Sequence, residues 1–181
     1  MSRLAAAVGV DAEAVAALLA AFAARGLTVA TAESLTGGLL SAVLTEIPGS
    51  SAVVSGGLVV YATELKHRLA DVPERLLAER GPVDPDVAAA LADGARRACG
   101  ADVGVGLTGV AGPDPQNGIP VGTWFVAVSG PGAHRDQRRG VPSDLPDPTS
   151  AGSAPDTRSL VRSAAVRSAL EMLANTAAMD S

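Results

Sequence analysis

The sequence predicts a layered α/β domain with helices on both faces of a sheet. Short Val-rich apolar runs alternate along the 181 residues with longer helical runs rich in Ala and Leu. Hydrophobic residues make up 48% of the chain but aromatic residues only 2%, so the core must consist of small aliphatic side chains, which suits close helix-on-sheet packing. Because the length fits one domain with a single core, we expect one domain over residues 1–181, with its core at about 10–175.

The first half of the chain is predicted to contain two helices and two strands. A helix over 12–24 follows the N-cap residue Asp11 and stops at Gly26. The next run, 27–32, is short and β-branched, which favours a buried strand. The remaining elements of this half are a helix over 37–46 and a Val-rich strand over 52–61, after which Lys66 lies in a short helical or loop segment before Pro73.

The second half alternates in the same way up to a segment of different composition. Its expected elements are a helix over 86–99, a strand over 102–107, a Gly- and Pro-rich loop over 108–120, a strand over 122–129 and a last helix over 157–175. The segment 130–156 is rich in Pro, Gly, Ser, Asp and Arg, so we expect a long loop there, with room for an edge strand within it.

Charge and hydropathy exclude several classes of protein. The formal net charge is −5 and the pI about 4.9, and the basic residues are scattered, whereas a nucleic-acid binder gathers them on one face. The longest apolar helical stretch, 14–24, falls short of the roughly 20 residues that a membrane span needs. The single cysteine, Cys99, cannot form an intramolecular disulfide, which fits a reducing compartment. We therefore expect a cytoplasmic protein that binds neither nucleic acid nor membranes.

A serine turn is the first candidate for chemistry. Residues 32–38 read A-E-S-L-T-G-G, which places Ser34 at a strand-to-helix turn with two glycines after it. Ligands of open α/β sheets bind at this carboxyl edge, and N–H groups at Thr36, Gly37 and Gly38 can approach an anion or a developing oxyanion closely. In this interpretation, Ser34 is a nucleophile at the ligand-binding edge of the sheet. The alternative, which turn chemistry alone supports equally, is that Ser34 or Thr36 only caps the helix.

Lys66 is the candidate base. Of 14 basic side chains 13 are Arg, and Lys66 is the only lysine. Arg stays protonated near neutral pH, whereas Lys can act as a base once burial or positive charge lowers its pKa from about 10.4 by roughly three units. The alternative is a solvated surface lysine. Tyr61, the only tyrosine, is expected either to relay a proton or orient Lys66, or to lie in the core with its hydroxyl at the surface.

Histidine and dinucleotide chemistry are not expected. His67 and His134 are the only histidines and lack acidic or cysteine partners at a ligand spacing, so we expect neither a metal site nor a Ser-His-Asp triad. The string G-V-G-L-T-G at 104–109 matches the dinucleotide fingerprint, but that fingerprint needs a helix directly afterwards and an acidic residue about 20 positions on. Because both are missing, we expect no cofactor and interpret Thr108 and Gly109 as part of a loop that closes over a ligand.

Arg158 and Arg162 lie four residues apart at the start of the last predicted helix, so they share one face. Two guanidinium groups there can hold a phosphate. The alternative is a solvated helix face.

Five motifs occur in a fixed order along the chain. They are A-E-S-L-T-G-G at 32–38, G-G-x-x-x-Y-x-x-x-x-K at 56–66, T-G-V-A-G-P at 108–113, P-V-G-T at 120–123 and the Arg158/Arg162 pair. Together they resemble the competence/damage-inducible CinA C-terminal domain family over about residues 10–175. The resemblance implies a three-layer α/β/α sandwich with a mixed, mostly parallel sheet, a Ser/Lys mechanism without metal or cofactor, and a homo-oligomer.

Stand-alone members of this family include nicotinamide-nucleotide amidase. The resemblance thus implies a small nucleotide substrate: hydrolysis of the carboxamide of nicotinamide mononucleotide to nicotinate mononucleotide and ammonia, in pyridine nucleotide salvage. By position it implies a nucleophile at Ser34, a base at Lys66 and a supporting hydroxyl at Tyr61. The implied substrate-binding residues are Thr36, Gly37, Gly38, Thr108, Gly109, Arg158 and Arg162.

Two segments depart from the family pattern. Residues 156–158 read Asp-Thr-Arg where members often read Gly-Asp-Arg, and the loop at 114–117 also differs. These departures leave the catalytic set intact and bear on substrate recognition. The rival interpretation is a regulatory domain that keeps the scaffold and senses a nucleotide without turning it over.

Overall fold

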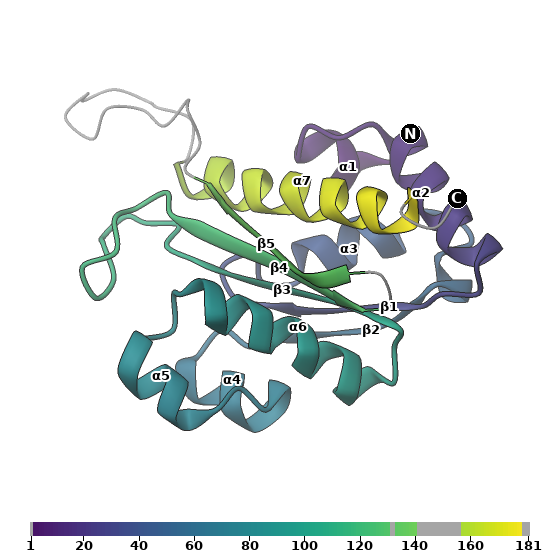
Figure 1. Ribbon diagram of the computed structural model, residues 1–181. Helices are drawn as coiled ribbons and strands as arrows, with labels where there is room; N and C mark the ends of the chain where they lie inside the picture. The colour runs from purple at the N-terminus through teal and green to yellow at the C-terminus, as the bar shows by residue number, and fades with distance from the viewer. Residues whose placement is uncertain (1, 131–132, 141–156, 179–181) are drawn as a thin grey trace.

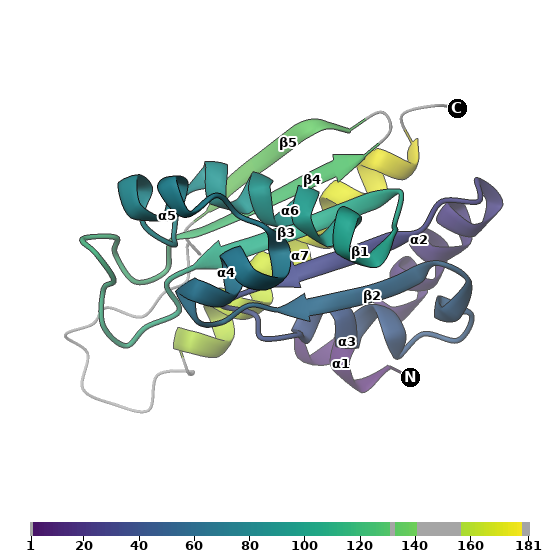
Figure 2. The same ribbon diagram turned by 90° about the horizontal axis from the view of Figure 1, so that it is seen from below.

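Five strands form one mixed sheet. The computed structural model describes residues 2–130, 133–140 and 157–178. The strands are β1 (Val29–Glu33), β2 (Val54–Val59), β3 (Val103–Gly109), β4 (Trp124–Gly130) and β5 (Ala133–Gly140). Their order is β2-β1-β3-β4-β5 (Figures 1 and 2). β1 pairs in parallel with β2 and β3, whereas β4 pairs antiparallel with β3 and β5.

Helices cover both faces of the sheet (Figure 1). One face carries α1 (Arg3–Ala7), α2 (Ala12–Ala24), α3 (Leu39–Thr45) and α7 (Thr157–Ala178). The other carries α4 (Thr63–Ala70), α5 (Glu74–Arg80) and α6 (Pro85–Cys99). A short 3₁₀ turn, η1 (Ser50–Ala52), precedes β2. The predicted three-layer α/β/α sandwich with a mixed sheet is confirmed.

The glycines of β3 allow α6 to lie directly on the sheet. A Cβ at Gly104 would come within 2.0 Å of the Ala92 carbonyl oxygen, and one at Gly106 within 2.1 Å of the Ala88 carbonyl oxygen. Two glycines of the string G-V-G-L-T-G therefore serve close helix–sheet packing. The opposite face holds the larger core, to which α2, α3 and α7 contribute apolar side chains, among them Phe22, Leu44 and Leu173.

Most predicted elements are present, with shifted ends. Asp11 caps α2 as expected, since its carboxylate accepts from the Glu13 N–H at 3.0 Å. The helix predicted over 37–46 is shorter, because Gly37 and Gly38 adopt left-handed φ values of 60° and 91°. The sequence interpretation missed α1 and α5. The segment 130–156 was predicted as a long loop with room for an edge strand, and its first part contains such a strand, β5; residues 141–156 lie outside the described residues.

The carboxyl ends of the three parallel strands meet at one edge of the sheet. Ser34 follows β1, Val60 and Tyr61 follow β2, and Thr108 and Gly109 close β3. Within the described residues, no helix combines the length and the apolar character needed to cross a membrane.

Candidate active site

A pocket of about 180 Å³ lies at this carboxyl edge. Six predicted site residues line it: Ser34, Tyr61, Lys66, Thr108, Gly109 and Arg158. The four others, Thr36, Gly37, Gly38 and Arg162, do not contribute to its wall. The volume is below the roughly 300–1,000 Å³ typical of sites that enclose a drug-sized ligand, so the pocket suits one ring and its substituent rather than a whole nucleotide.

Ser34 and Lys66 meet at the inner wall of the pocket. The Lys66 Nζ donates to Ser34 Oγ at 2.7 Å and to the Val60 carbonyl oxygen at 2.9 Å. Lys66 is only 1% exposed, so the surface-lysine alternative is wrong. No carboxylate contacts the Nζ among the described residues.

Burial changes the acid–base behaviour of this lysine. Loss of hydration disfavours the ammonium form and lowers the pKa of Lys66 to about 8. At pH 7 roughly one molecule in ten then carries a neutral amine, against fewer than about one in a thousand for an ordinary lysine. A neutral amine within hydrogen-bond distance of a serine hydroxyl can remove its proton.

The turn after β1 aims the Ser34 hydroxyl at Lys66. The Ser34 N–H donates to the Leu107 carbonyl oxygen of β3 at 3.0 Å, and the Gly37 N–H donates back to the Ser34 carbonyl oxygen at 3.1 Å. The left-handed φ values of Gly37 and Gly38 complete the turn, so these glycines shape it rather than line the pocket. Among the described residues the N–H groups of Leu35, Thr36 and Gly38 have no acceptor.

Neither Ser34 nor Thr36 caps α3, so the capping alternative is wrong. The N-cap position is Gly38, which has no side chain for the purpose. The carboxylate of Glu33 does this work instead: it accepts from the Leu40 N–H at 3.0 Å and from the Ser41 N–H at 2.8 Å. The sequence interpretation missed Glu33, although an acidic residue at the end of a buried strand was a visible signal.

Tyr61 lines the pocket and is largely exposed. It is 60% exposed, so the core alternative is wrong. Its hydroxyl accepts from the Arg158 Nη2 at 2.9 Å, and no hydrogen bond joins it to Ser34 or Lys66 in the described part of the chain. Tyr61 therefore contacts the arginine and not the Ser–Lys pair.

The two arginines at the start of α7 hold different segments. Arg158 lines the pocket and donates from Nη1 to the Gly112 carbonyl oxygen at 2.9 Å. Arg162 donates to the Thr36 carbonyl oxygen at 2.7 Å, behind the serine turn. Both arginines are half-buried and hold different segments. The structure therefore fits neither a pair of guanidinium groups that hold one phosphate nor a solvated helix face. Arg158 lines the pocket, and Arg162 holds the turn through the Thr36 carbonyl oxygen.

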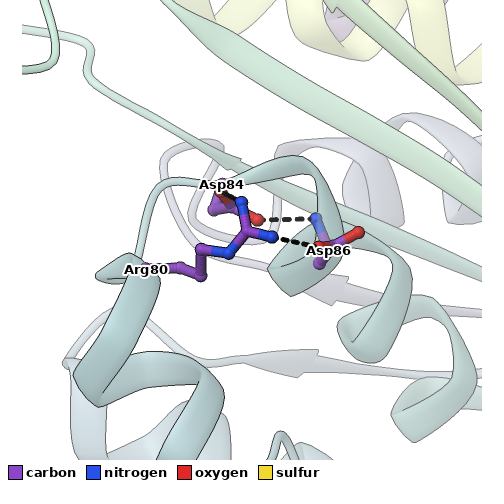
Figure 3. Close-up of polar contacts among 3 residues, drawn as sticks. All are labelled: Arg80, Asp84 and Asp86. Carbon is purple, nitrogen blue, oxygen red and sulfur yellow. Dashed lines mark hydrogen bonds and ion pairs between the residues drawn. The ribbon is translucent and has the colours of Figure 1, made fainter.

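One wall of the pocket is fastened by a cluster of polar contacts. The Thr108 hydroxyl donates to the Pro82 carbonyl oxygen at 2.7 Å, in the connection between α5 and α6. Just beside it, Arg80 reaches Asp84 at 3.7 Å and Asp86 at 3.5 Å (Figure 3). Thr108 thus fixes the wall, and no local pattern in the sequence indicates Pro82 as its partner.

The described residues offer no cluster of three or more His, Cys, Asp or Glu side chains that could hold a metal ion. The site's polar chemistry comes from Ser34, Lys66 and Arg158, with one carboxylate, Asp114, also in the lining. Such a set is suited to acyl transfer with a small charged substrate.

Comparison with known proteins decides the family. The profile of the CinA C-terminal domain matches residues 11–177. The chain belongs to this family. It is 48% identical over 122 residues to a CinA-like protein of Frankia casuarinae, a match covering 67% of this chain and 28% of the relative. It is 40% identical over 149 residues to a putative competence-damage inducible protein of Desulforamulus reducens, covering 81% of this chain and 33% of the relative.

Solved structures of the family share the fold. The competence/damage inducible protein CihA from Agrobacterium tumefaciens superposes with a TM-score of 0.80 at 34% identity, over 91% of this chain and 94% of that one. The competence damage-inducible protein A (ComA) from Klebsiella pneumoniae gives a TM-score of 0.80 at 30% identity, over 94% and 98%. The matched region spans about a third or less of the curated relatives, but nearly all of these two crystallised chains.

Proposed function

We propose that this CinA-family domain is an amidohydrolase that converts nicotinamide mononucleotide to nicotinate mononucleotide and ammonia. The observation that carries the proposal is the 2.7 Å contact between Ser34 Oγ and the Nζ of the buried Lys66, whose pKa burial lowers to about 8, in a pocket wall. The family resemblance supplies the substrate.

In the acylation step, neutral Lys66 accepts the Ser34 proton while Oγ attacks the carboxamide carbon. A tetrahedral intermediate forms with negative charge on the former carbonyl oxygen. The N–H groups of Leu35, Thr36 and Gly38 have no protein acceptor in the described part of the chain and are the candidates to stabilise that charge. The Gly37 N–H of the predicted set is committed to the Ser34 carbonyl oxygen.

Collapse of the intermediate breaks the C–N bond. The Lys66 ammonium returns its proton to the leaving nitrogen, so ammonia departs and an acyl-Ser34 ester remains. Lys66, neutral again, then removes a proton from water as the water oxygen attacks the ester. The carboxylate product leaves and Ser34 regains its proton from Lys66.

Substrate recognition follows from the size and charge of the pocket. A volume of about 180 Å³ suits the nicotinamide ring, so the ribose phosphate extends toward the mouth. Arg158, held by Tyr61 and Gly112, is positioned there to bind the phosphate. The carboxylate of Asp114 in the same lining favours a positively charged pyridinium ring over a neutral one.

The test is ammonia release from nicotinamide mononucleotide by the wild type, Ser34→Ala and Lys66→Arg. We expect at least about a 1,000-fold loss for Ser34→Ala and at least about a 100-fold loss for Lys66→Arg, because Arg cannot lose a proton near neutral pH. The matched control is Ser55→Ala, an exposed serine of β2 outside the pocket, which should keep wild-type activity.

Each outcome has a definite meaning. No release by the wild type contradicts the amidase proposal, and an active Lys66→Arg variant contradicts the lysine-base mechanism. Tight binding of the nucleotide without ammonia release would assign the pocket a sensing role instead.

A further inference from the structure

We propose that Glu33 is a positioning residue for this reaction: its buried carboxylate closes the turn that carries Ser34 and so holds Oγ at the Nζ of Lys66. This inference rests on the proposed roles of Ser34 and Lys66. Glu33 ends β1, directly before the nucleophile, and is fully buried. A buried carboxylate destabilises the fold unless its oxygens are hydrogen-bonded. The hydrogen-bond partners of Glu33 therefore indicate its role.

All partners of the carboxylate lie on β1 or at the start of α3. Oε2 accepts from the Leu40 N–H at 3.0 Å. Oε1 accepts from the Ser41 N–H and the Ser41 hydroxyl, both at 2.8 Å, and from the Thr31 hydroxyl at 3.2 Å. The side chain thus joins the last residue of the strand to the first turn of the helix and encloses residues 34–39.

The backbone fixes the other end of the same turn. The Glu33 carbonyl oxygen accepts from the Val60 N–H at 2.9 Å, and the Ser34 N–H donates to the Leu107 carbonyl oxygen at 3.0 Å. The strand side is therefore held by both neighbouring strands. The helix side is held to β1 by the Glu33 carboxylate, which binds two backbone N–H groups of α3, and by the 2.6 Å hydrogen bond between the Thr31 and Ser41 hydroxyls. Without the carboxylate, the glycine-containing turn has more freedom, and the Ser34–Lys66 distance is less tightly fixed.

The carboxylate performs this task without contacting the lysine. Thr31 and Glu33 share one face of β1 with α3, while Ser34 turns toward Lys66 of α4, in the opposite helical layer (Figure 1). A carboxylate beside Lys66 would stabilise the ammonium and raise its pKa. Because Glu33 lies on the face of β1 opposite Lys66, it can position Ser34 without raising the pKa of the lysine. That pKa is lowered by burial alone.

A carboxylate is needed because two backbone N–H groups approach its two oxygens. In Glu33→Gln, one of these N–H groups would face an NH₂ group, so one bond is lost and two donors meet. The matched control is Glu46→Gln. Glu46 also binds the first N–H groups of a helix, those of Arg3 and Leu4 in α1, both at 2.9 Å, but lies outside the pocket.

The experiment compares the wild type, Glu33→Gln and Glu46→Gln, well below their melting temperatures, in three readouts. The first is kcat and KM for nicotinamide mononucleotide. The second is the rate of labelling by a fluorophosphonate, in which Ser34 Oγ forms a bond to phosphorus and fluoride is released. The third is the pKa of Lys66, followed by its ¹³Cε resonance. Since Lys66 is the only lysine, ¹³C-lysine labelling gives one signal that needs no assignment.

We expect Glu33→Gln to lower kcat and the labelling rate by about 10- to 100-fold, the scale of a misplacement of about 1 Å, with KM within about 3-fold and the Lys66 pKa unchanged. Glu46→Gln should keep kcat. Wild-type kcat in Glu33→Gln, an equal loss in Glu46→Gln, or a shifted Lys66 pKa each overturns the inference.

Two further arms keep the test decisive. If Glu33→Gln does not fold, the double variant Thr31→Val/Ser41→Ala takes its place. It removes both hydroxyl donors from Oε1 of Glu33 and should lower kcat by about 3- to 10-fold. An unchanged kcat overturns the inference. If the wild type releases no ammonia, the proposed function fails, and the labelling rates still decide whether Glu33 positions Ser34.

Discussion

The buried lysine links the folding stability of this protein to pH. Burial lowers the folded-state pKa of Lys66 to about 8 from its ordinary value of 10.5, so between these values the unfolded chain binds more protons than the native chain. Stability must then rise as the pH increases through this window. Well below pH 8 both states are protonated and the lysine destabilises the fold by a constant amount, about 3 kcal/mol for a pKa lowered from 10.5 to about 8.

The Lys66→Met variant isolates this contribution. Met has a similar length and no charge, so the stability of the variant lacks the pH dependence that Lys66 contributes. Every other titrating group is the same in the variant and the wild type. Between pH 7 and pH 10 the difference in unfolding free energy, wild type minus Lys66→Met, should rise by about 2 to 3 kcal/mol. Urea titrations at several pH values measure it. A difference that stays constant within about 0.5 kcal/mol would refute a desolvated lysine, because it would mean equal pKa values in both states.

Three other variants test the parts around the Ser–Lys pair. Tyr61→Phe removes the hydroxyl that accepts from Arg158, so KM should rise about 3- to 10-fold with kcat nearly unchanged; a large loss of kcat would instead favour proton relay by Tyr61. Arg158→Gln should raise KM for nicotinamide mononucleotide at least about 10-fold but barely change activity on nicotinamide riboside, which lacks the phosphate, and equal effects on both substrates would exclude phosphate binding. Arg162→Ala leaves the Thr36 carbonyl oxygen without its guanidinium partner, so we expect a loss of about 1 to 3 kcal/mol in urea titrations, and wild-type stability would show that this brace is dispensable.

The fold could be predicted because each layer has its own pattern in the sequence. Ala-rich helical runs and short Val-rich runs give most helices and strands, and the cap at Asp11 was visible. The helix α5 was missed because its seven residues, charged at both ends, lack a sustained apolar period. The edge strand β5 could be expected only as an option within a segment of loop-like composition, since pairing with β4 decides its conformation.

The candidate site was predictable in its residue types but not in its contacts. The solitary lysine pointed to Lys66, yet only the parallel pairing of β1 with β2 brings its Nζ to Ser34. The pairing of Arg162 with Thr36 spans 126 positions of the chain and has no local signal. Glycines 37 and 38 were assigned to the ligand, whereas their φ values show that the turn itself requires them. Assembly into a homo-oligomer and a cytoplasmic location stay predictions of the sequence.

The most direct test of the Ser–Lys mechanism is to titrate the single lysine and the reaction together. In the ¹³C-lysine-labelled wild type, the ¹³Cε shift gives the pKa of Lys66 in the free enzyme, and kcat/KM for nicotinamide mononucleotide is measured over the same pH range. We predict one apparent pKa near 8 in both curves, with kcat/KM rising about tenfold from pH 7 to pH 9 and then levelling off. A lysine that titrates above about pH 10, or a rate that follows another pKa, would contradict the role of Lys66 as the base.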